Sequence, residues 1–119
     1  MLPATIAPAT KIDRATLLAL VDGDKELLRD VVRLFLEDGP RTLERLRAGL
    51  AGGNALQVQI AAHTLAGNAG SFGAAGVVTL ARNLERKGRD HNLTDCGPDL
   101  DELEAAVDAL CRGLQDFLE

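Results

Sequence analysis

The feature that most constrains the fold is the recurrence of apolar residues every three or four positions through most of the chain. The segment after Asp24 shows it clearly, with Leu27, Leu28, Val31, Leu34 and Phe35. Residues at this spacing lie on one face of an α-helix, whereas a half-buried strand needs alternation with a period of two. Residues that favour strands are also scarce, since aromatic side chains make up only 3% of the 119 residues. The sequence therefore predicts an all-α protein.

Capping residues and glycines divide this pattern into one short helix and four longer ones. We expect the helices at about 13–21, 24–51, 55–70, 74–88 and from position 98 to near the C-terminus. Asp24 and Asn54 are the expected N-caps of the second and third helices, and Pro98 fits the first turn of the last. Pro40 leaves two alternatives, one long helix that bends or two helices that meet there. Four long amphipathic helices with short connections predict an antiparallel four-helix bundle with a short additional N-terminal helix.

The N-terminal residues differ from the rest. Residues 1–11 contain Pro3 and Pro8 and show no periodic pattern, so we expect a flexible N-terminal segment, followed by one domain over 12–119. The segment also lacks the basic start and continuous apolar stretch of a secretory signal. We expect a cytoplasmic, monomeric protein.

Composition argues against several classes of function. The formal net charge is −5 and there is no Trp or Tyr, which is unfavourable for binding nucleic acid. No apolar run approaches the roughly 18 residues that a membrane-spanning helix needs. Cys96 and Cys111 are too few for a disulfide scaffold or a structural zinc site, so we expect two free thiols and no metal site.

The two histidines occupy different settings. His91 lies in a predicted polar loop, where a solvated side chain is expected, whereas His63 lies in the middle of the third helix. The residues predicted to face inward from this helix and its C-terminal end are Val58, Ala61, Ala62, Leu65, Ala69 and Phe72. His63 is therefore expected to project away from the core.

The neighbours of His63 on that outer side are small. One turn before it and up to two turns after it lie Gln59, Ile60, Ala66, Gly67 and Gly70. A glycine inside a helix costs about 1 kcal/mol relative to alanine, so two glycines here need some compensation. Either they admit a neighbouring helix, with His63 hydrogen-bonded at the edge of the bundle, or they leave the imidazole accessible to the backbone of another protein. The periodicity does not distinguish these alternatives.

The segment AHTLAGNAGSFGA and its flanking helices resemble the histidine-containing phosphotransfer (HPt) domains of two-component phosphorelays. The signature of that family is a helix carrying His-x-Leu-Lys-Gly, then small residues and a further Gly, and His63, Leu65, Gly67 and Gly73 match it in register. A Phe-Leu-Glu-Asp-x-Pro run at 35–40 also matches. The resemblance covers about residues 12–118.

This resemblance implies that His63 accepts a phosphoryl group from an aspartyl phosphate on a receiver domain and passes it to another response regulator. The expected partners are receiver domains and a hybrid histidine kinase. The chain would be a carrier, not an autonomous kinase, and would need no cofactor because the receiver supplies Mg²⁺. A neutral imidazole is a competent nucleophile near pH 7.

The resemblance also implies a role for Glu85, which lies 22 residues after His63 on the next predicted helix. Its carboxylate would accept a hydrogen bond from Nδ1 of His63 and leave Nε2 as the nucleophile. The alternative is an ion pair with Arg82 or Arg89 on its own helix. The two are compatible if the carboxylate uses both oxygens.

Ala66 is a departure from the family, because most members have Lys at this position. We expect position 66 to be exposed, so that Ala66→Lys is tolerated and speeds transfer. The candidates to contact phosphate or receiver are Gln59, Ile60, Ala66, Gly67, Asn68, Gly70, Arg82 and Arg86. If none replaces the missing lysine, the alternative is a pseudo-HPt adaptor that binds receiver or kinase domains without phosphotransfer.

Overall fold

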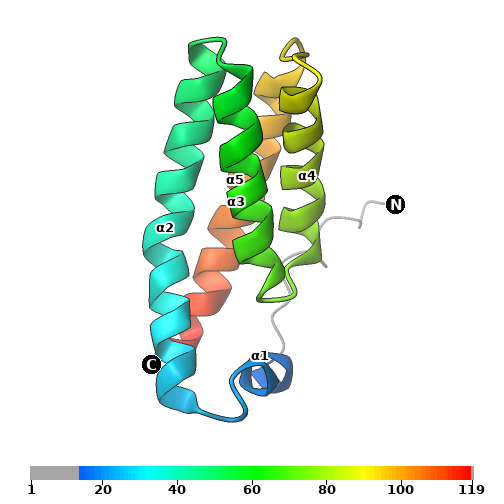
Figure 1. The fold of residues 1–119 in the computed structure, drawn as a ribbon. Helices are drawn as coiled ribbons and strands as arrows, with labels where there is room; N and C mark the ends of the chain where they lie inside the picture. The colour runs from blue at the N-terminus through cyan, green and yellow to red at the C-terminus, as the bar shows by residue number, and fades with distance from the viewer. Residues whose placement is uncertain (1–13, 119) are drawn as a thin grey trace, which may run out of the picture.

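The computed structural model describes residues 14–118, which contain helices and connecting turns. The elements are α1 (Arg14–Leu20), α2 (Lys25–Ala51), α3 (Ala55–Gly70), α4 (Ala75–Arg89), α5 (Cys96–Gln115) and a short 3-10 helix (Asp116–Leu118). Helices α2 to α5 run antiparallel in a bundle, and α1 lies across one end of it (Figure 1). The predicted fold is confirmed. The predicted flexible segment and position 13, where the first helix was expected to begin, lie outside the described residues.

The ends of the helices follow from local sequence. Asp24 Oδ1 accepts a hydrogen bond from the Leu27 amide at 3.1 Å, and Asn54 Oδ1 accepts one from the Gln57 amide at 3.0 Å. Both predicted N-caps are therefore confirmed. Helix α5 begins two residues before Pro98, which still places this proline in the first turn, where no intrahelical N–H donor is required.

Pro40 does not divide α2, which is one continuous helix of 27 residues. A proline in a helix leaves one carbonyl of the preceding turn without its usual donor. The helix nevertheless continues, and the buried Thr42 hydroxyl is satisfied within it by donating to the Asp38 carbonyl at 2.8 Å. Of the two alternatives at this proline, the single helix is correct.

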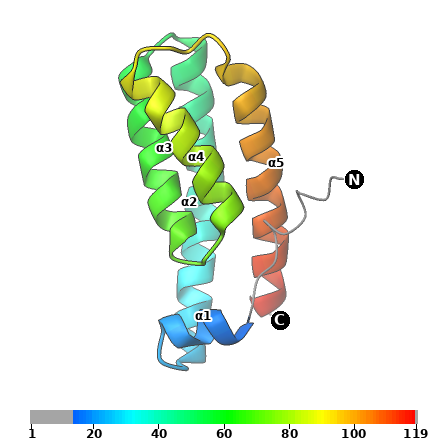
Figure 2. The ribbon, with the colours of Figure 1, turned by 90° about the vertical axis from the view of Figure 1, so that its right-hand side faces the viewer.

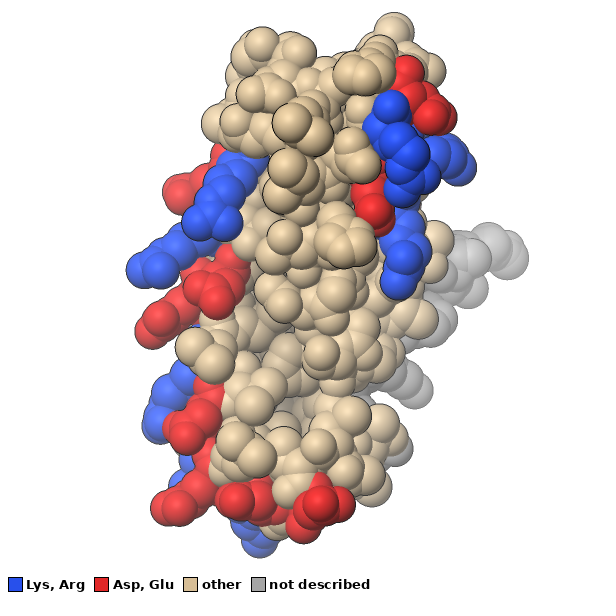
Figure 3. Space-filling model, viewed as in Figure 1, with Lys and Arg blue, Asp and Glu red and all other residues tan. Residues whose placement is uncertain are grey.

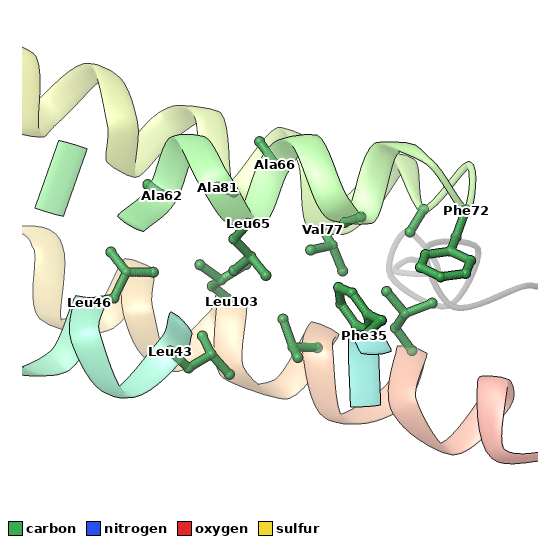
Figure 4. Packing of buried hydrophobic residues seen from close by; sticks show 14 of the residues in the cluster. Phe35, Leu43, Leu46, Ala62, Leu65, Ala66, Phe72, Val77, Ala81 and Leu103 are labelled. Atoms are coloured by element: carbon green, nitrogen blue, oxygen red, sulfur yellow. The ribbon is translucent and has the colours of Figure 1, made fainter. Parts of the chain in front are cut away.

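Leucine and other aliphatic side chains from α2 to α5 form the core between the helices. Leu46 from α2, Leu65 from α3 and Leu103 from α5 meet there (Figure 4). Towards the α1 end of the bundle, the Phe35 and Phe72 rings pack edge to face with their centroids 5.4 Å apart. This geometry is favourable for aromatic pairs.

Fewer leucines of α2 are buried than the apolar period of this helix predicts. Leu27 and Leu34 are 46% and 59% exposed, whereas Leu28 and Phe35 are buried. The pattern therefore predicts the helix correctly but not which of its leucines are covered. Those on the side where no other helix packs stay in solvent.

Residues 14–118 can also be checked for membrane-spanning helices and for the state of the two cysteines. None of the helices is both long enough and apolar enough to cross a membrane. Cys96 is buried and Cys111 half-buried, both as free thiols. Burial raises the pKa of both thiols, which keeps them protonated at neutral pH.

Candidate functional site

His63 lies on the outer side of α3, and 72% of its side chain is exposed. Its neighbours in sequence toward the core, Ala62 and Leu65, are fully buried. The predicted orientation of the imidazole is thus confirmed. His91 is also exposed, but it lies in the turn after α4 with φ 56°, as part of a polar loop.

Glu85 on α4 contacts His63 across the helix pair. Its Oε2 lies 2.9 Å from His63 Nδ1, and only 12% of the Glu85 side chain is exposed. An ionised carboxylate can only accept hydrogen bonds, so Nδ1 carries the proton in this pair. The Nε2 lone pair is then free on the exposed side of the ring. This is the tautomer that a nucleophilic Nε2 requires.

Arg89 shares the same carboxylate oxygen. Its Nη2 lies 3.4 Å from Glu85 Oε2, one helical turn along α4. Glu85 therefore makes both of the contacts that the sequence left open, one with His63 and one with Arg89. Both involve the same oxygen, Oε2, whereas one oxygen for each contact was expected from the sequence. Arg89 also supplies a positive charge beside a mostly buried carboxylate, which lowers the cost of its burial.

The glycines after His63 leave room for a side chain. A Cβ atom at Gly67 would meet nothing within 4 Å, and one at Gly70 would meet Val78 Cγ2 at an ordinary contact distance of 3.7 Å. Neither glycine is needed for the approach of another helix. Of the two alternatives, the structure therefore favours a surface left clear beside the imidazole.

The predicted exposure of Ala66 is wrong. Ala66 is only 2% exposed and belongs to the hydrophobic core. In Figure 4 its side chain lies on the side of α3 away from Leu65, next to α4. The reason is that α3 packs against α2 on one side and α4 on the other. The buried part of the α3 circumference is therefore wider than the apolar stripe predicted from the sequence, and it includes Ala66.

The remaining predicted residues divide between two helices. On α3, Ile60 is 57% exposed, Asn68 is exposed and Gln59 is half-buried. On α4, Arg82 and Arg86 are exposed, and Arg86 Nη2 donates to Asn83 Oδ1 at 2.7 Å. Within residues 14–118, Glu85 pairs with His63 and Arg89 but not with Arg82.

The surface around α3 is largely uncharged. In Figure 3 a broad strip without charged side chains runs along this helix, bordered on both sides by basic and acidic residues. Arg82, Arg86 and Arg89 line an open hollow on the α4 side, together with the acidic residues Glu85, Asp99 and Glu102. Of these three arginines, Arg89 contacts the His63–Glu85 pair, through the Glu85 carboxylate.

Gly88 is a residue whose importance the sequence did not reveal. A Cβ atom there would lie 2.7 Å from the Gln59 amide nitrogen and 2.8 Å from the Ala55 carbonyl oxygen. Helix α4 therefore touches the backbone of α3 at this residue. A glycine at the predicted end of this helix, one turn after Glu85, did not indicate such a contact, because glycine is common where a helix ends.

Polar contacts join α4 to the start of α5. Asp99 accepts hydrogen bonds from Lys87 Nζ and from Asn83 Nδ2. The hydrogen bond to Asp99 raises the pKa of Lys87, so this lysine stays charged. Within residues 14–118 there is no group of three or more His, Cys, Asp or Glu placed to hold a metal ion.

Comparisons with known proteins agree with this geometry. A family model described as the Hpt domain matches residues 30–113. A similar solved structure is histidine-containing phosphotransfer protein B (HptB) from Pseudomonas aeruginosa PAO1, with a TM-score of 0.83 and 21% identity. The match covers 92% of this chain and 94% of that one. No curated protein sequence matches the chain.

Proposed function

Because this chain belongs to the Hpt domain family, we propose that it is a phosphoryl carrier in which His63 accepts a phosphoryl group from a receiver-domain aspartyl phosphate and passes it to another response regulator. Members of this family carry phosphoryl groups in phosphorelays and do not act as kinases. The observation that carries the proposal is the exposed His63 imidazole, held through Nδ1 by a nearly buried Glu85.

The geometry suits nucleophilic attack by Nε2. Its lone pair forms the N–P bond while the P–O bond to the receiver's aspartate breaks, and the electron pair leaves with the aspartate carboxylate. Nδ1 keeps its proton, so the phosphorylated ring becomes positively charged. The Glu85 carboxylate, 2.9 Å from Nδ1, stabilises that charge and holds the ring in place. In the reverse reaction, the aspartate of a second receiver attacks the phosphorus, the N–P bond breaks, and the electron pair goes back to Nε2.

The partner's contribution follows from the same chemistry. Charge that develops on a transferring phosphoryl group is stabilised by Mg²⁺, which we assign to the receiver domain. The open backbone at Gly67 and the exposed Ile60 and Asn68 suit close approach of a receiver, with Arg82 and Arg86 at the margin. We propose receiver domains and a hybrid histidine kinase as partners, with this chain acting as a monomer.

A second candidate function is a pseudo-HPt adaptor that binds receiver domains without transfer. The observation that favours it is Ala66, since the residue at this position supplies no positive charge and is buried. The two functions are separated by incubating the protein with a phosphorylated receiver and Mg²⁺. A carrier acquires an acid-labile phosphate on His63 and transfers it to a second receiver. An adaptor binds the receiver but stays unlabelled.

Glu85→Ala should slow phosphoryl acceptance about tenfold, which is the size of effect known for residues that orient metal-ligating histidines. Without the carboxylate, the His63 proton is free to move between Nδ1 and Nε2, and part of the population loses its nucleophilic lone pair at Nε2. The ¹⁵N chemical shifts of the ring nitrogens report this tautomer mixture directly. An unchanged rate together with unchanged ring shifts would contradict the assigned role of Glu85.

A further inference from the structure

We propose that Gly88 is a positioning residue of the phosphotransfer site. By lacking a side chain, it lets α4 lie against the backbone of α3 at the separation that brings Glu85 within hydrogen-bond distance of His63. This inference rests on the function proposed above and adds a residue that touches neither the phosphoryl group nor the imidazole.

The contact at Gly88 is with backbone atoms and not with flexible side chains. A Cβ atom would lie 2.7 Å from the nitrogen and 3.0 Å from the Cα of Gln59, and 2.8 Å from the oxygen of Ala55. Side-chain rotation cannot relieve such contacts, because all of these atoms belong to the α3 helix itself. Any larger residue at position 88 must therefore move α4 away from α3.

This contact lies one turn from the site on both helices. Gln59 precedes His63 by four residues on α3, and Gly88 follows Glu85 by three on α4. The other end of the helix pair is joined by a short turn after Gly70, in which Gly73 has φ 70°. The His63–Glu85 hydrogen bond therefore lies between two points at which the helices are held together.

The views in Figures 1 and 2 agree with this arrangement. Helices α3 and α4 lie side by side, and α4 runs obliquely so that its C-terminal end approaches the start of α3. A displacement at that end is transmitted to Glu85 because a helix moves largely as a rigid rod over one turn. A bond of 2.9 Å has little room to lengthen before it is lost.

Gly88→Ala tests the proposal. We expect the ring ¹⁵N shifts of His63 to move toward a mixture of tautomers, and acceptance from a phosphorylated receiver to slow about tenfold, as for other losses of an orienting hydrogen bond. Both are measured at a temperature where circular dichroism shows the variant fully folded. Unchanged ring shifts in the folded variant would overturn the proposal.

A matched control separates positioning from general loss of stability. Leu110→Ala removes a fully buried side chain of α5 and leaves the contact between Gly88 and α3 intact. It should lower the melting temperature but leave the His63 ring shifts as in the parent protein. If Leu110→Ala moves these shifts as much as Gly88→Ala does, the effect is one of stability and the proposal fails.

A double-mutant cycle identifies the route of the effect. If Gly88 acts through the His63–Glu85 bond, Gly88→Ala should change the labelling rate by less than about twofold once Glu85 is replaced by Ala, because coupled residues are not additive. An equal loss in both backgrounds would overturn the proposal. The ¹⁵N ring shifts are measured without phosphate, so they test the positioning role of Gly88 even if the parent protein is not labelled. Absence of labelling in the parent protein would refute the proposed carrier function but not the positioning role.

Discussion

His63→Gln is expected to abolish phosphoryl acceptance and leave the helical content unchanged. A glutamine amide has no nucleophilic nitrogen lone pair, so the N–P bond cannot form. The fold should tolerate the change because the side chain is 72% exposed. The glutamine NH₂ group can also still donate to Glu85, which leaves the carboxylate partnered. The measurement is the amount of acid-labile phosphate after incubation with a phosphorylated receiver.

The other histidine provides the matched control. His91→Asn changes an exposed loop residue at φ 56°, a conformation that asparagine accepts readily. This variant should be labelled at the rate of the parent protein. Label that persists in His63→Gln and disappears in His91→Asn would assign the phosphate to the loop and refute the site.

Ala66→Lys is expected to destabilise the protein by about 1–3 kcal/mol, the usual cost of adding bulk to a packed core. Ala66 is 2% exposed, in a helix that packs against both α2 and α4. A lysine there must either bury its ammonium group or push its stem between the helices to reach water. The earlier expectation that the fold tolerates lysine at position 66 is therefore withdrawn, and a loss of stability is expected instead. Denaturant-induced unfolding measures the free-energy difference.

Gly67→Lys adds the same charge at the next position and should change stability in the other direction. Its Cβ atom meets nothing within 4 Å, and replacing a helical glycine by lysine stabilises an exposed helix by up to about 1 kcal/mol. A loss of stability in Ala66→Lys together with a gain in Gly67→Lys would show that position 66 lies on the buried side of α3 and position 67 on its exposed side. An equal gain in both would show that position 66 is exposed and would contradict its burial.

Features that depend on local sequence were predictable. Asp24 and Asn54 cap their helices because each side-chain oxygen reaches an amide three residues ahead, a contact that needs no other part of the protein. His63 was correctly placed outside the apolar face of its helix for a similar reason. The 3.6-residue period sets which side chains share a face.

Features that depend on neighbouring helices were not predictable in the same way. Leu34 fits the period of α2 but is 59% exposed, whereas Ala66, which was predicted to lie on the outer side beside His63, is buried. Periodicity defines the direction in which a side chain points, but not how much of the helix circumference is covered. That coverage depends on how many helices pack against it and at which angles.

The sequence by itself thus determined the helices, the N-caps of α2 and α3, the bundle and the exposed histidine, because these follow from contacts within a few residues and from burying apolar faces. Only the tertiary structure decided that Glu85 bonds to His63 while also pairing with Arg89, that Ala66 is core, and that Gly88 meets the backbone of α3. These features require the distance between two helices to be known to a fraction of an ångström. That distance results from the packing of the whole interface and is not encoded at any one position.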